Sequence, residues 1–79
     1  MSKQRFKEEF IAYKRNGGAM CFAYGDIRIP VTYNEDDDVI GVKVKGDDLN
    51  LLVDYRLDLL ENLSNLEDML LEWHPELIR

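Results

Sequence analysis

The sequence predicts an α+β domain of 79 residues in the order α-β-β-β-α. Three observations lead to this prediction. An amphipathic N-terminal segment stops at two glycines, the middle of the chain alternates apolar and polar residues, and the last third carries an apolar stripe with helical period. We expect one domain, 1–79, built as a three-stranded antiparallel meander with the N-terminal helix and a long C-terminal helix packed on one face.

A basic helix is expected over residues 1–17. Phe6, Phe10 and Tyr13 would share one face of it. The cations that follow, Lys14 and Arg15, suit the negative end of the helix dipole. Asn16-Gly17-Gly18 should end the helix, because glycine adopts the left-handed capping conformation without steric cost.

The antiparallel sheet is expected over residues 19–45. Gly25-Asp26 has the composition of a two-residue hairpin turn with glycine first. Residues 27–33 and 39–45 each alternate apolar and polar side chains, which predicts one buried and one wet face. The short connections make neighbouring strands antiparallel.

Pro30 is an awkward residue for a middle strand, because it lacks the amide hydrogen that a central strand donates. The expected turn places Cys21 opposite Pro30. The missing donor would then point towards the third strand near Gly41 and Val42. We therefore expect a bulge or a gap in the ladder there.

An acidic amphipathic helix is expected over residues 48–74, with 75–79 as a short tail. Asp47 or Asp48 would cap it, and Pro75 would end it. A helix from Leu49 to Trp73 would span about 37 Å at ~1.5 Å per residue, whereas a domain of this size is ~30 Å across. The helix would therefore overhang its own core. A capping-box pattern that begins at Ser64 leaves open a break near 62–64.

The charge and hydropathy of the chain argue against a nucleic-acid-binding protein and a membrane protein. The net charge is −6, and residues 47–79 carry nine acidic against two basic side chains. Such a chain has no basic footprint for direct binding of nucleic acid, and a basic protein surface is the favoured partner. It contains no apolar run of the ~20 residues that a membrane span requires, so no membrane association is expected. A cytoplasmic location is expected, because the N-terminus does not resemble a signal peptide.

No catalytic, cofactor or metal site is expected. The loop 34–38 has the alternating oxygen ligands of a calcium loop, but Val39 and Lys45 stand where glycine and glutamate are required. His74 has no partners at metal-ligand spacing, and Cys21 lies in an apolar strand, so both are interpreted as structural. The absence of a nucleophile motif predicts a protein that is not an enzyme.

The expected function is that of a small acidic interaction module, a regulator or inhibitor. It would bind a basic protein, for example one that binds nucleic acid, through its C-terminal helix. The alternative is a homodimer that uses the same helix. A merely solvated acidic face is the competing interpretation of the charges. The expected partner-binding residues are an acidic edge, an apolar patch and the acidic loop: Asp54, Asp58, Glu61, Asp68 and Glu72; Leu66, Met69, Leu70 and Trp73; Glu35, Asp36, Asp37 and Asp38.

Overall fold

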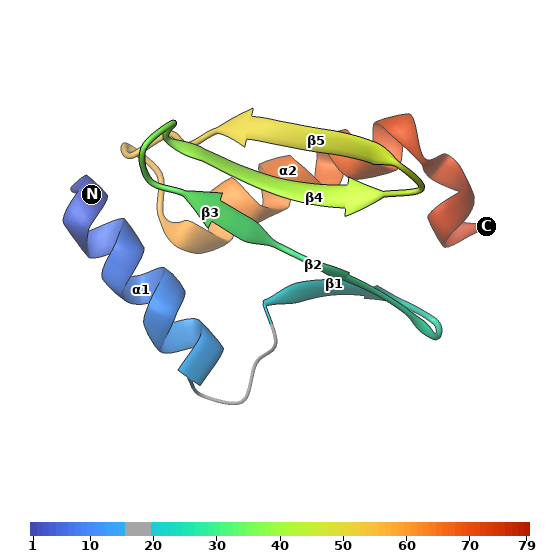
Figure 1. Cartoon of the computed structure of the whole chain (residues 1–79), viewed down its shortest axis with the longest axis horizontal. Helices are drawn as coiled ribbons and strands as arrows, with labels where there is room; N and C mark the ends of the chain where they lie inside the picture. Colours follow the sequence, from blue (N-terminus) through green and yellow to red (C-terminus); the bar gives the residue numbers. More distant parts are fainter. Residues whose placement is uncertain (16–19) are drawn as a thin grey trace.

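Figure 1 shows a computed structural model of the chain, which describes residues 1–15 and 20–79. The predicted helix stop at residues 16–18 and the predicted strand start at 19 lie outside the described residues. The elements follow in the order α1 (Lys3–Arg15), β1 (Cys21–Tyr24), β2 (Ile27–Pro30), β3 (Thr32–Asn34), β4 (Val39–Val44), β5 (Asp47–Leu52), α2 (Leu59–Trp73) and the 3-10 helix η1 (Pro75–Ile78).

The α+β class is confirmed, and the sheet differs in detail from a single meander. β1 and β2 form a two-stranded antiparallel hairpin, and β3, β4 and β5 form a three-stranded antiparallel sheet in that order. The first hairpin has the predicted register, with Cys21 opposite Pro30. Gly25 begins its turn with φ of 60°, a conformation that glycine adopts without strain.

The predicted ladder gap occurs at Pro30. β2 ends there, and the next residue, Val31, belongs to neither sheet although its amide donates to the carbonyl of Met20 at 2.8 Å. The β3–β4 ladder begins with Thr32 opposite Gly41 and does not extend to Val42. Because Pro30 has no amide hydrogen, one long strand is divided between two sheets.

The prediction of a helix from residue 48 is wrong at its N-terminal end. Residues 47–52 form β5, which pairs with β4 along six residues from Val39↔Leu52 to Val44↔Asp47. The connecting turn is Lys45-Gly46, with φ values of 51° and 85°. Two positive φ angles define the type I′ turn, whose twist matches that of the flanking strands. The apolar residues Leu49 and Leu51 fit a strand with one inward face as well as they fit a helical stripe.

The helix α2 begins at Leu59, eleven residues later than predicted. Its N-cap is Asp58, whose carboxylate accepts from the amide of Glu61 at 2.8 Å, so Asp47 and Asp48 are not caps. Its 15 residues span ~22 Å, so it does not overhang a molecule that measures 36 × 25 × 19 Å. The helix continues through Ser64 without the alternative break and ends at Trp73 as predicted. The expected tail forms η1.

The core lies between α2 and the inner face of the sheet. In Figure 1, α2 runs behind β4 and β5, while α1 lies to one side, next to β3. No helix in the described residues is long and apolar enough to cross a membrane. The buried apolar residues come from α1, β2, β4 and α2, with Met20, Val31 and Val53 from the connections: Phe6, Phe10, Met20, Ile29, Val31, Ile40, Val42, Val44, Val53, Leu59, Leu63, Leu66 and Leu70.

Candidate protein-interaction surface

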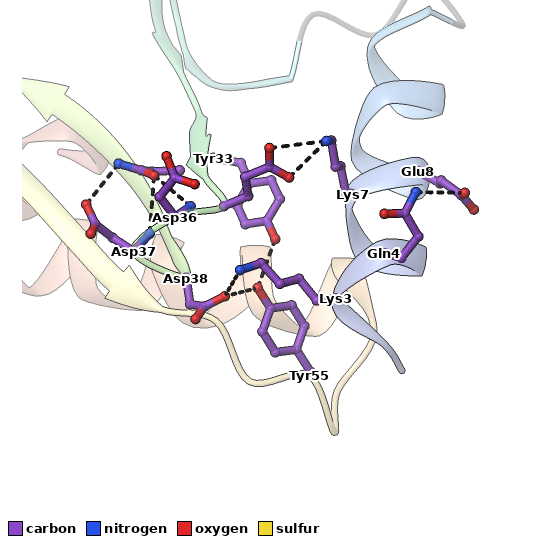
Figure 2. A network of polar contacts seen from close by, with 11 residues as sticks. Lys3, Gln4, Lys7, Glu8, Tyr33, Asp36, Asp37, Asp38 and Tyr55 are labelled. Atoms are coloured by element: carbon purple, nitrogen blue, oxygen red, sulfur yellow. Dashed lines mark hydrogen bonds and ion pairs between the residues drawn. The ribbon is translucent and has the colours of Figure 1, made fainter.

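Two ion pairs attach α1 to the acidic loop between β3 and β4 (Figure 2). Lys3 Nζ lies 3.1 Å from Asp38 Oδ1, and Lys7 Nζ lies 2.9 Å from Glu35 Oε2. The hydroxyl of Tyr55 also donates to Asp38 at 2.7 Å. This hydrogen bond, followed by that from Lys3, holds the pKa of Asp38 below its ordinary value.

An aromatic cluster lies beneath these ion pairs. Phe6 is fully buried, and its ring centroid lies 5.1 Å from that of Tyr33 and 5.7 Å from that of Tyr55, both in edge-to-face geometry. The hydroxyls of the two tyrosines are 2.8 Å apart. Burial, followed by the bonds to Tyr33 and Asp38, raises the pKa of Tyr55. Two cations of α1 are therefore paired with two of the four acids of the loop, above a packed aromatic cluster.

The expected loop residues are accordingly divided between two environments. Glu35 and Asp38 are half-buried against α1, whereas Asp36 and Asp37 are exposed. The Asn34 side chain organises the loop by accepting from the amides of Asp36 and Asp37 at 3.0 and 3.3 Å. Within residues 1–15 and 20–79, no group of three metal-ligating side chains lies together.

Asp54 does not belong to the edge of α2 on which it was predicted. It precedes the helix, and its carboxylate accepts from Nε and Nη2 of Arg56 at 3.0 and 2.9 Å and from the Arg56 amide at 3.0 Å. The Arg56 side chain, followed by the Arg56 amide, lowers the pKa of Asp54. This carboxylate therefore orders the 53–58 loop.

The remaining four acidic residues form one line on the solvent side of α2. We call Asp58, Glu61, Asp68 and Glu72 the acidic ridge; all four are exposed. Their steps of three, seven and four residues place them on one face, and the line extends ~21 Å. No described cation lies within ion-pair distance of the ridge.

The expected apolar patch is mostly part of the protein's own core. Leu66 and Leu70 are fully buried, so their placement on an exposed patch is wrong. Their stripe is covered by the sheet that β5 extends. Met69 is half-buried, but Trp73 is 67% exposed and Ile78, on η1, is 65% exposed. What remains accessible is the aromatic end of the helix.

Sequence reasoning missed the structural role of Asn62. This side chain is buried; its Oδ1 accepts from the Asp54 amide at 2.9 Å, and its Nδ2 donates to the carbonyls of Asp54 and Asp58 at 3.0 and 2.8 Å. It joins the 53–58 loop to α2 immediately below the ridge. The feature of the sequence that could have revealed this role is a polar residue within the apolar stripe between Leu59 and Leu66, because a buried polar group requires hydrogen-bond partners.

The buried His74 lies between the end of α2 and the β4–β5 hairpin. Its Nε2 lies 3.0 Å from Asp47 Oδ2, and its Nδ1 lies 3.0 Å from Glu76 Oε1. Lys45 reaches the same Glu76 oxygen at 2.8 Å. Bonds from Lys45, from the Glu76 amide and from His74 lower the pKa of Glu76 to about 2.

A groove between α1 and the start of α2 was also not predicted. It has a volume of about 480 Å³. Leu59 is buried, whereas Tyr13 and Leu60 are 45% and 63% exposed. The groove is lined by Met1, Arg5, Glu9, Ala12, Tyr13, Asp58, Leu59 and Leu60. Asp58 belongs both to the groove and to the ridge, so the two features are continuous.

Comparison with known proteins found no matching family model, no matching curated protein and no matching solved structure.

Proposed function

We propose that this protein is a non-catalytic protein-binding module, a regulator or inhibitor, whose acidic ridge binds a basic surface of another protein. The observation that carries this proposal is the line of four exposed carboxylates along ~21 Å of α2, none of which lies within ion-pair distance of a described cation. Trp73 adds an exposed aromatic anchor at the end of the same helix.

The distribution of charge within the molecule favours a binding role over a merely solvated face. Two of the acids in the β3–β4 loop are paired with Lys3 and Lys7, so the fold does partner carboxylates where it brings cations close. Among the residues that the structure describes, the ridge has no such ion-pair partners, and α2 carries Glu72 in a last turn that has no basic residue. A carboxylate at the negative end of a helix dipole costs about 0.3–1 kcal/mol.

The test compares two variants with equal changes in charge. In the ridge variant, Glu61→Gln, Asp68→Asn and Glu72→Gln remove three charges. In the control, Glu8→Gln, Asp26→Asn and Asp48→Asn remove three exposed charges elsewhere. Partners captured from the native host by the wild-type protein are purified, and their dissociation constants are measured by calorimetry at low and high salt.

We expect the ridge variant to weaken binding at least about tenfold and to flatten its salt dependence, since the carboxylates provide the electrostatic attraction. The control variant should retain the affinity of the wild-type protein. A Trp73→Ala variant should bind more weakly at every salt concentration, because its contribution is apolar. Equal affinity of wild-type protein and ridge variant would exclude the proposal.

A narrower form of the proposal is that the partner binds nucleic acid through the same basic surface. The ridge carries one charge per ~5 Å, whereas duplex DNA carries one per ~1.7 Å of axis, so the resemblance is local. Competition measures this directly: labelled duplex bound to the captured partner should be displaced by wild-type protein and not by the ridge variant. Ternary complexes would reject the narrower form.

Self-association is the second candidate, and β5 favours it. β5 is the edge of its sheet, and Leu52 on that strand is 69% exposed. An exposed edge strand is a template for pairing with a second copy. The apolar stripe of α2 does not serve this role, because Leu66 and Leu70 are in the core. Analytical ultracentrifugation of the wild-type protein and of Leu52→Lys tests this candidate. A dimer that forms through β5 should dissociate in the variant. A mass of 9.3 kDa for the wild-type protein at all concentrations would exclude self-association.

A further inference from the structure

We infer that the groove between α1 and α2 receives an apolar side chain of a basic amphipathic helix, whose cations lie along the acidic ridge. This inference rests on the proposed function and adds the chemistry and shape of the partner. It commits to one occupant, a helical segment of another protein. The observations are the groove lining, its continuity with the ridge, and the arrangement of charge around it.

The groove is apolar where an anchor would enter. Leu59 lies at its base and is 5% exposed, while Leu60 and Tyr13 stand exposed at its rim. Ala12 keeps the groove open, because it is the small residue on the flank of α1 that also carries Arg5, Glu9 and Tyr13. The volume of about 480 Å³ lies in the range of sites that accept a large side chain or small ligand.

The charged residues around the groove determine which end of the partner helix would carry the apolar anchor and which would carry the cations. Arg5 on the α1 wall is bound to Glu9, with Nε 3.3 Å from Oε1. This neutral pair offers a cation of the partner no net attraction, so an apolar residue is favoured there. Asp58 on the opposite wall begins the ridge, and Glu61, Asp68 and Glu72 continue it away from α1. A partner with an apolar anchor at one end and cations along the rest complements both parts.

A helix fits the spacing of the ridge better than an extended segment. Glu61, Asp68 and Glu72 lie at steps of seven and four residues along α2. A helix that packs along α2 rises by the same ~1.5 Å per residue, so cations at the same steps remain in phase. In an extended chain that rises by ~3.3 Å per residue, these distances of ~10.5 and ~6 Å correspond to about three and two residues, and a step of three places the side chain on the opposite face.

The experiment uses synthetic helical peptides as probes of the full chain. Each has about 18 residues, enough for measurable helicity, with lysines at the steps of the ridge and a leucine anchor at the N-terminal end or, in a second peptide, at the C-terminal end. A third peptide has the same composition in scrambled order. Affinity is measured by calorimetry, and the site by amide chemical shifts.

We expect one of the two anchored peptides to bind at least about tenfold more tightly than the scrambled peptide and to shift the amides of Ala12, Tyr13 and Leu60. Ala12→Leu fills the groove and should weaken binding about tenfold. Ala23→Leu makes the same change on exposed β1 and should have no effect. Leu60→Ser provides a second groove variant, and circular dichroism shows that each variant is folded.

The outcomes separate this inference from the proposed function. Peptide binding confined to the ridge, with equal affinity for wild-type protein and Ala12→Leu, overturns the inference and leaves the ridge proposal in place. Equal binding of anchored and scrambled peptides, or no binding at millimolar concentration, also overturns it. By contrast, if the ridge variant binds the captured partners as tightly as the wild-type protein does, the proposed function and this inference are both excluded.

Discussion

At the scale of single residues, the described fold depends on polar side chains that replace missing backbone partners. Asn62 makes three hydrogen bonds to the backbone of the 53–58 loop, and Asp58 caps α2. The loop leaves β5 and enters α2 within six residues, too few for it to satisfy its own backbone groups by regular structure. These two side chains therefore determine where the chain turns.

Replacement of Asn62 with alanine should destabilise the protein by about 2–3 kcal/mol, because the Asp54 amide loses its partner in a part-buried position. Chemical denaturation measures the free energy of unfolding. Asn65→Ala is the matched control on the exposed side of the same helix and should change stability by less than about 0.5 kcal/mol. Equal unfolding midpoints for the two variants would refute the role assigned to Asn62.

Glu76 makes stability depend on pH in the acid range. Its pKa is lowered from 4.5 to about 2, so the folded state binds this proton less readily than the unfolded chain. The stabilisation is therefore present above about pH 4.5 and is lost as the pH falls towards 2. Thermal unfolding of Glu76→Gln should show a weaker pH dependence in this window. Lys45→Met should remove part of the same dependence and add little to Glu76→Gln; additive effects would contradict the contact.

At the scale of elements, the β4–β5 hairpin decides the fold of the C-terminal half. Its inward residues Ile40, Val42 and Val44 are buried, and β5 brings Leu49 and Leu51 beside them. Those leucines are half-buried in the sheet. In the predicted helix the same residues would have left the edge of β4 unpaired, with its amides and carbonyls directed to solvent.

Gly46→Ala tests the turn of this hairpin. Gly46 has φ of 85°, and no atom lies within 4 Å of the position of an added Cβ, so the cost is conformational and not steric crowding. We expect a loss of about 1–2 kcal/mol. Gly46→Asn should cost clearly less, because asparagine tolerates the left-handed region. Denaturation of both variants measures the difference, and identical losses would argue against the type I′ geometry.

At the scale of the whole molecule, the two helices differ in how they are held. α2 buries five of its residues, whereas α1 buries Phe6 and Phe10 and adds surface ion pairs. Exposed ion pairs contribute about 0–1 kcal/mol each. The attachment of α1 is therefore the weaker of the two, and this matters because α1 forms one wall of the groove.

Native-state hydrogen exchange should show this hierarchy. The amides of α1 are expected to exchange through a local opening of lower free energy than that of α2 and β4, because less apolar area must be exposed to release α1. Lys3→Met with Lys7→Met should accelerate exchange in α1 and leave α2 unchanged. Equal protection of both helices would indicate a single cooperative unit.

The sequence by itself determined the features that follow from local chemistry. These are the first helix, the Gly25-Asp26 hairpin and its register, the interruption at Pro30, and the end of the second helix before Pro75. Each depends on residues close together in the chain, so composition and spacing were sufficient. The acidic ridge also follows from a helical period that remains in the observed α2.

The tertiary structure alone decided the state of residues 47–52 and the exposure of the apolar stripe. Leu49, Leu51 and Val53 suit a helix and a strand equally by period; the unpaired edge of β4, together with the Lys45-Gly46 turn, selects the strand. The additional strand shortens the helix and helps to enclose Leu66 and Leu70. Local pattern sets which faces are apolar, but only long-range pairing sets which of them remains uncovered.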